Sequence, residues 1–168
     1  MDIDTFLQIQ SIGLLLFFLF ILLYKLQKIF HYFKNKSLLT KNKTLKKIKR
    51  LSWENFELLT IELFEKEGWN VRGNEKKGAD GGVDIWMHKK SFTKKNISAI
   101  VQCKCYTEAL VTIKVIREMY GLMHEYSVDE VYIVTTSRFT KECYSFVRDK
   151  NMTLIDGEVL VKRIAKIV

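Results

Sequence analysis

The sequence is poor in the residues that build disulfide frameworks, metal clusters and nucleotide-binding loops. It has three cysteines and three histidines in 168 residues. An odd number of cysteines argues against a disulfide framework, and Cys103-x-Cys105 lacks the second ligand pair of a zinc site. We therefore expect free thiols in a reducing compartment. The glycine patterns that cradle nucleotide phosphates, GxGxxG and GxxxxGK[ST], are also missing.

Acidic residues are absent from residues 25–50, although this segment carries ten of the 28 lysines and arginines. From Leu51 onward there are 18 basic and 17 acidic residues, so the net charge of +9 belongs almost wholly to the segment before that point. A basic run can release counterions from DNA phosphates or contact anionic lipid head groups. Both uses of residues 25–50 stay open, and the overall charge alone is weak support for DNA binding.

Charged residues are also missing between Asp4 and Lys25. A helix of about twenty residues spans roughly 30 Å, the thickness of a bilayer core. The acidic start argues against a cleaved signal peptide, and the basic flank on the C-terminal side predicts that this side is cytoplasmic. We therefore predict a single-pass cell-membrane anchor over residues 1–24 with its N-terminus outside. Residues 25–50 would form a basic juxtamembrane helix and tether that contacts anionic lipid.

Two apolar stretches carry polar residues at a defined spacing. Asp84 lies in a predicted strand that follows a glycine-containing loop, and a second apolar strand ends in Gln102-Cys103-Lys104. Alternation along a strand puts Gln102 and Lys104 on one face and Cys103 on the other. If the two strands pair as a hairpin around residues 89–96, Asp84 lies beside that face. The Asp84 carboxylate, the Gln102 amide oxygen and the Lys104 ammonium group would then lie close together on that face.

This grouping suits the hydrolysis of a phosphodiester. Hard divalent cations such as Mg²⁺ prefer oxygen ligands, and a bound ion acidifies water and neutralises phosphate charge. A neighbouring lysine stabilises developing negative charge or orients the attacking water. We predict that Asp84, Gln102 and the backbone carbonyl of Cys103 bind Mg²⁺, with Mn²⁺ as an alternative, and that Lys104 faces the phosphate. Asp80 is the rival to Asp84, which we favour because an acid within a strand needs a partner.

The run Gly78-Ala79-Asp80-Gly81-Gly82-Val83-Asp84, followed by Gln102-Cys103-Lys104, resembles the Mrr-type restriction endonuclease domain. This domain is a branch of the PD-(D/E)xK nucleases in which glutamine commonly replaces the usual acid. The resemblance extends from about residue 51 to residue 168. Further motifs that match in order are Trp53-Glu54-Asn55-Phe56-Glu57, Glu67-Gly68-Trp69, Val134-Thr135-Thr136-Ser137-Arg138-Phe139 and Leu154-Ile155-Asp156-Gly157.

The resemblance implies an α/β fold of the restriction-endonuclease type, with a mixed central sheet flanked by helices, over residues 51–168. The predicted transmembrane helix would precede it. The resemblance also implies that Glu57, on the first helix of the domain, reaches the metal site, often through water. We expect the remaining glutamates of that helix to be solvated; they are Glu54, Glu62, Glu65 and Glu67.

The implied function is a Mg²⁺-dependent DNA endonuclease that acts in restriction or defence against foreign DNA at the membrane. Two alternatives stay open: a Holliday-junction resolvase, which needs a symmetric homodimer, and a catalytically silent DNA-binding module held at the membrane. The chain departs from the family in one respect. Mrr enzymes typically carry a separate DNA-reading domain, and here the predicted anchor and tether take its place, so recognition of methylated DNA is not carried over.

Overall fold

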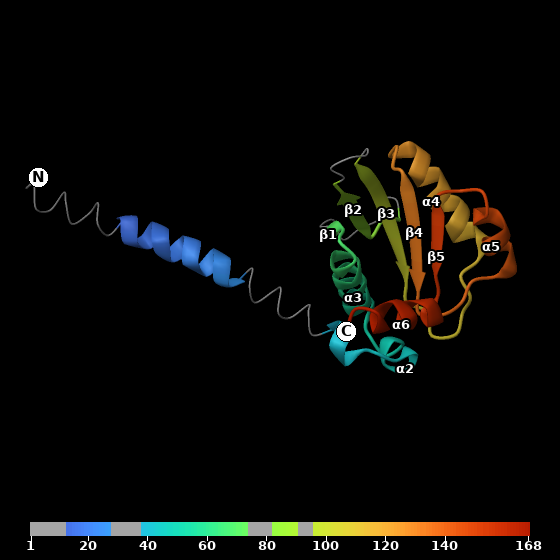
Figure 1. Cartoon of the computed structure of the whole chain (residues 1–168), viewed down its shortest axis with the longest axis horizontal. Coiled ribbons are helices and arrows are strands. Elements are labelled where there is room, and N and C mark those ends of the chain that lie inside the picture. The colour runs from blue at the N-terminus through green and yellow to red at the C-terminus, as the bar shows by residue number, and fades with distance from the viewer. Residues whose placement is uncertain (1–12, 28–37, 74–81, 91–95) are drawn as a thin grey trace, which may run out of the picture. The chain divides into compact units, whose positions relative to one another are not determined.

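The computed structural model describes residues 13–27, 38–73, 82–90 and 96–168. The chain divides into two compact units, Met1–Ser37 and Leu38–Val168. In the first unit, residues 13–27 are helical (Figure 1, blue). Within the described ranges, no helix is long and apolar enough to cross a membrane. Most of the predicted juxtamembrane helix, and the loop that holds Asp80, lie outside the described residues.

The second unit is built around a five-stranded sheet with the strand order β1-β2-β3-β4-β5. Strands β1, β2 and β3 pair antiparallel, and β3, β4 and β5 pair parallel. The strands are β1 (Asn70–Gly73), β2 (Ile85–Lys89), β3 (Ile97–Lys104), β4 (Glu130–Thr135) and β5 (Met152–Ile155). The predicted hairpin is therefore present. Its register pairs Ile85 with Val101, so Asp84, one residue before β2, lies next to the end of β3.

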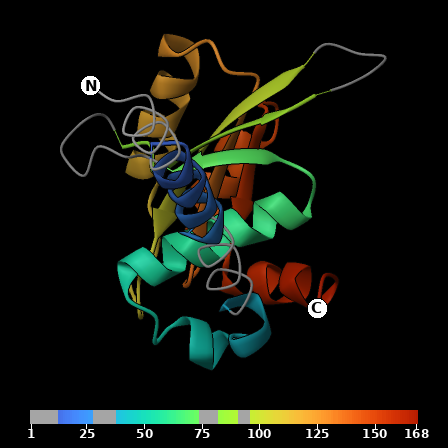
Figure 2. The same cartoon turned by 90° about the vertical axis from the view of Figure 1, so that its left-hand side faces the viewer.

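Helices cover both faces of this sheet (Figures 1 and 2). They are α2 (Leu45–Ile48), α3 (Trp53–Lys66), α4 (Ile113–Glu125), α5 (Lys141–Val147) and α6 (Gly157–Ala165). Helices α3 and α6 pack on one face, and α4 and α5 pack on the other. Helix α3 begins at Trp53, where the Ser52 hydroxyl caps it by accepting the N–H of Asn55 at 3.3 Å. The helix is followed by Gly68 at a φ of +87°, a conformation that favours glycine.

The compact unit starts at Leu38, whereas the sequence predicted a domain boundary at Leu51. The side chains of Leu39 and Ile48 are 0% exposed and belong to the same apolar cluster as α3 and α6. Helix α2 also contacts α6. Residues 38–50 are thus part of the folded domain rather than a tether, because their two buried aliphatic side chains complete its core.

Glu62 was expected to be solvated, and this expectation was wrong. Its side chain is 3% exposed, and its Oε2 accepts a hydrogen bond from the Leu39 N–H at 3.4 Å. Burial raises the pKa of the Glu62 carboxyl, and the Leu39 hydrogen bond and the charge of Lys66 only partly oppose this effect. Glu62 therefore connects α3 to the segment that precedes α2.

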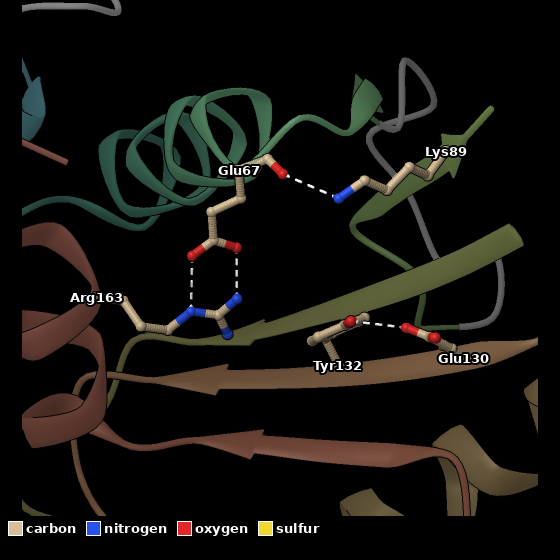
Figure 3. A network of polar contacts seen from close by, with 5 residues as sticks. All are labelled: Glu67, Lys89, Glu130, Tyr132 and Arg163. Carbon is tan, nitrogen blue, oxygen red and sulfur yellow. Dashed lines mark hydrogen bonds and ion pairs between the residues drawn. The ribbon is translucent and has the colours of Figure 1, made fainter. Parts of the chain in front are cut away.

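Glu67, also expected to be solvated, pairs with Arg163 of α6 (Figure 3). Arg163 donates from Nε to one carboxylate oxygen at 2.8 Å and from Nη2 to the other. The Lys89 ammonium of β2 donates to the Glu67 backbone carbonyl at 3.2 Å. The C-terminal end of α3 is thereby joined to α6 and to β2.

A prediction about pH follows from the raised pKa of Glu62. In the folded chain this carboxyl keeps its proton at pH values above its ordinary pKa of 4.5. The neutral carboxyl contributes stability that is fully present below that ordinary pKa, and this contribution is lost as the pH rises through the folded-state pKa. Glu62→Gln keeps an oxygen acceptor for Leu39 and cannot ionise. We expect this variant to have a higher free energy of unfolding than the parent at pH 7, and a similar one near the ordinary pKa of the carboxyl.

Urea unfolding of the full-length chain at both pH values measures the difference. Glu125→Gln, at an exposed position of α4, serves as the control and should follow the parent at each pH. Parallel stability curves for the parent and Glu62→Gln would contradict the assignment.

Candidate functional site

The carboxyl end of β3 brings together residues that the sequence singled out. The Asp84 Oδ2 accepts a hydrogen bond from the Cys103 N–H at 2.6 Å and a short one from the Gln102 side-chain amide. The Asp84 N–H donates to the Val101 carbonyl at 3.0 Å, which continues the hairpin beyond β2. The carboxylate and the amide are thus in direct contact at the end of the sheet.

Glu57 and Lys104 also interact with the Asp84 carboxyl. Burial raises the pKa of Asp84, and three influences oppose it: the Cys103 N–H, the positive charge of Lys104 and a hydrogen bond with Glu57. Burial also raises the pKa of the Cys103 thiol well above its ordinary value, with the Asp84 charge as the next cause. Glu57 from α3 and Lys104 from β3 therefore both act on Asp84, while the Cys103 side chain stays a neutral thiol in the core.

The Thr135-Thr136-Ser137 turn after β4 supports the backbone that leaves the site. The Thr135 hydroxyl donates to the Lys104 carbonyl at 2.8 Å, and the Thr136 hydroxyl donates to the Tyr106 carbonyl at 2.6 Å. The Ser137 hydroxyl donates to the Ala109 carbonyl at 2.6 Å. The sequence marked this turn only through its resemblance. In the structure, the hydroxyls of this turn donate hydrogen bonds to the carbonyls of Lys104, Tyr106 and Ala109, and so hold the segment that follows β3 in place.

A cavity of about 440 Å³ lies beside the same turn. Its charged lining residues are Lys49, Arg138, Glu108 and Glu158. Arg138, which follows the turn directly, lies on the wall of this cavity. Because the two cations are matched by two carboxylates, the cavity has no strong positive field of its own.

The donor atoms at Asp84 suit a hard cation. They are the carboxylates of Asp84 and Glu57 and the Cys103 carbonyl, all of them oxygens of the kind that Mg²⁺ accepts. The Gln102 amide turns its nitrogen toward Asp84, so its oxygen would reach a cation there only after the amide turns over. In the described part of the chain, no group of three or more His, Cys, Asp or Glu residues could hold a metal ion. Asp80 lies outside the described residues, so its rivalry with Asp84 remains open.

A family model for the Mrr catalytic domain, described as restriction endonuclease, matches residues 48–164. The chain belongs to this restriction endonuclease family. The expectation of a restriction-endonuclease-like nuclease domain is thus confirmed, and the family hydrolyses DNA. The match also begins inside α2, ahead of the boundary that the sequence predicted. No curated protein matches the chain.

Three solved structures match the chain in part, and one of them, with a TM-score above 0.5, shows a similar fold. The DNA modification-dependent restriction endonuclease AspBHI is 16% identical with a TM-score of 0.59, and the match covers 79% of this chain and 35% of that one. MspJI in complex with a 27-mer oligonucleotide is 20% identical with a TM-score of 0.49, over 64% and 26% of the two chains. FokI is 16% identical with a TM-score of 0.48, over 74% and 27%. The chain thus matches about a third or less of each of these proteins.

Proposed function

We propose that this protein is a metal-dependent endonuclease that hydrolyses phosphodiester bonds of DNA, in restriction or defence against foreign DNA. One observation supports it above the others. Inside a domain of the restriction endonuclease family, the Asp84 carboxylate meets the Gln102 amide and lies within the influence of Glu57 and Lys104. Carboxylates, a neutral oxygen donor and an ammonium group are the set that phosphodiester hydrolysis needs.

Each residue has a distinct role in this proposal. Asp84, the carbonyls of Gln102 and Cys103, and Glu57 through water would hold Mg²⁺ or Mn²⁺, which supplies an acidified water and neutralises charge on the phosphate. Lys104 orients the attacking water and offsets the charge that builds up on the pentacovalent phosphorus. The water oxygen forms a new bond to phosphorus while one ester P–O bond breaks. One side of the cut keeps the phosphate and the other gains a hydroxyl.

Nicking of supercoiled plasmid DNA by the full-length chain tests the proposal. We expect conversion to open circles with Mg²⁺ or Mn²⁺ and none with EDTA. Plasmid from a methylating host and a four-way junction are assayed in parallel, because the chain could require modified or branched DNA. Binding of these DNAs without cutting of any of them would contradict the endonuclease and favour a silent binding module.

We also propose that residues 1–24 anchor the protein in the cell membrane, with the nuclease domain in the cytoplasm. The support lies in the sequence: the twenty uncharged residues 5–24 and the basic residues that follow them. Residues 25–50 would then contact anionic lipid through their lysines. Extraction of cell membranes with alkaline carbonate tests the anchor, since a peripheral protein is released by this treatment and an integral one is not.

A further inference from the structure

Six lysines and arginines of the folded domain lie together in the segment that precedes α3. Residues 38–53 contain no aspartate or glutamate. Lys49 is partly exposed, and the other five cationic side chains are exposed; they are Lys41, Lys43, Lys46, Lys47 and Arg50. We call residues 41–50 the basic segment. The domain therefore carries charge of one sign at this place, although its overall charge from Leu51 onward is nearly balanced.

The basic segment is held on the domain, so its cations have defined positions. Leu39 and Ile48 are fully buried in the core that also contains α3. The Asn42 side-chain amide donates to the Leu38 carbonyl at 2.9 Å, and the Leu39 N–H donates to Glu62 of α3 at 3.4 Å. A partner that binds here does not have to order a loose chain first, which lowers the free-energy cost of binding.

The C-terminal end of the basic segment lies beside the end of β3 that carries Lys104. The thiol of Cys105, one residue after Lys104, donates to the Leu51 carbonyl at 3.7 Å. Lys49 also lines the cavity beside the turn after β4, together with Thr136 of that turn. Figure 1 shows α2 at the end of the sheet where β3 and β4 end. The basic segment and the candidate site are thus neighbours on one end of the domain.

We propose that the basic segment binds the DNA phosphates next to the one that is cut. The inference rests on the proposed function. DNA carries a regular row of phosphates, so DNA whose scissile phosphate lies at Asp84 and Lys104 brings neighbouring phosphates along the same end of the sheet. Lysine and arginine side chains there neutralise these phosphates and release counterions, without reading the sequence. The basic segment supplies affinity, and the residues around Asp84 supply the chemistry.

An anionic membrane is the other polyanion that these cations could contact. A bilayer held against the basic segment would cover the end of the sheet at which DNA has to reach Asp84 and Lys104. The position of the basic segment beside the site therefore favours DNA. In this proposal, contact with anionic lipid is left to the lysines of residues 25–37.

Fluorescence anisotropy of a labelled DNA duplex, titrated with the full-length chain in nonionic detergent and EDTA, tests the proposal. Lys47→Gln/Arg50→Gln removes two exposed cations of the basic segment. At about 0.1 M salt we expect the affinity to fall roughly tenfold for each lost phosphate contact, and the slope of log K against log salt to become shallower by about 0.9 per contact.

Lys90→Gln/Arg148→Gln is the matched control, because it also removes two exposed cations. Lys90 follows β2 and Arg148 precedes β5, so both lie toward the opposite end of the sheet, where β3 and β5 begin. This variant should bind the duplex with the affinity and the salt dependence of the parent. Circular dichroism of each variant establishes that it is folded.

The outcomes separate this proposal from the proposed function. The proposal is overturned if Lys47→Gln/Arg50→Gln binds the duplex like the parent, if the control loses as much affinity, or if the parent binds no duplex. If Lys47→Gln/Arg50→Gln keeps its affinity for DNA but binds less well to phosphatidylglycerol vesicles, the basic segment contacts lipid instead. If the variant loses affinity for DNA as expected and yet the parent cuts no DNA, the basic segment stands and the endonuclease proposal fails.

Discussion

Asp84→Asn and Lys104→Met should each reduce the single-turnover rate of DNA cleavage by roughly 10²- to 10⁴-fold, the range for loss of one group that acts on the transition state. Asp84→Asn keeps an oxygen for the Cys103 N–H but removes the negative charge that would hold the proposed cation. Lys104→Met keeps the apolar stem and removes the ammonium. Rates of plasmid nicking at saturating metal and excess enzyme measure both effects.

Two further variants sharpen this test. Lys114→Met removes a lysine from an exposed position of α4 and should leave the nicking rate unchanged. Asp80→Asn addresses the rival assignment, because Asp80 precedes Asp84 in the same glycine-containing run. If cleavage were lost in Asp80→Asn and retained in Asp84→Asn, the metal ligand would be Asp80. If Lys104→Met cut at the parental rate, the lysine would have no part in the chemistry.

A chain that begins at Leu51 should fail to fold, although the sequence motifs of the domain begin there. Such a chain lacks Leu39 and Ile48, whose side chains are fully buried against α3 and α6. Each large-to-small change at such a position costs about 2–5 kcal/mol, and removal of both approaches the whole stability of a small domain. We therefore expect Leu39→Ala and Ile48→Ala to lower the free energy of unfolding by about 2–5 kcal/mol each.

Urea unfolding followed by circular dichroism compares chains that begin at Leu38 and at Leu51 with the full-length protein. The chain from Leu38 should show a cooperative transition, and the chain from Leu51 should not. Lys41→Ala, at an exposed position of the same segment, is the control and should unfold at the parental urea concentration. Equal midpoints for the two shortened chains would mean that residues 38–50 do not contribute to the core.

Features that depend on neighbours in the sequence could be predicted without coordinates. The two apolar strands on either side of residues 89–96 indicated a hairpin, because pairing across a short turn is local, and the antiparallel register of β2 and β3 bears this out. The Ser52 cap before α3 and Gly68 after it are signals of this local kind, since capping involves residues only a few positions apart. The resemblance of the run from Gly78 to Asp84, followed by Gln102-Cys103-Lys104, to the Mrr-type domain indicated the restriction endonuclease family, which the family match confirmed.

Features that depend on distant segments appeared only when the chain was folded. Residues 38–50 resemble a solvated tether by their lysines, and only the packing of Leu39 and Ile48 shows that they belong to the core. Glu62 follows the pattern of a surface glutamate, yet the backbone of Leu39 buries it. Local patterns specify strands and helix ends, whereas the partners of a buried polar group come from whichever segments the fold brings to it.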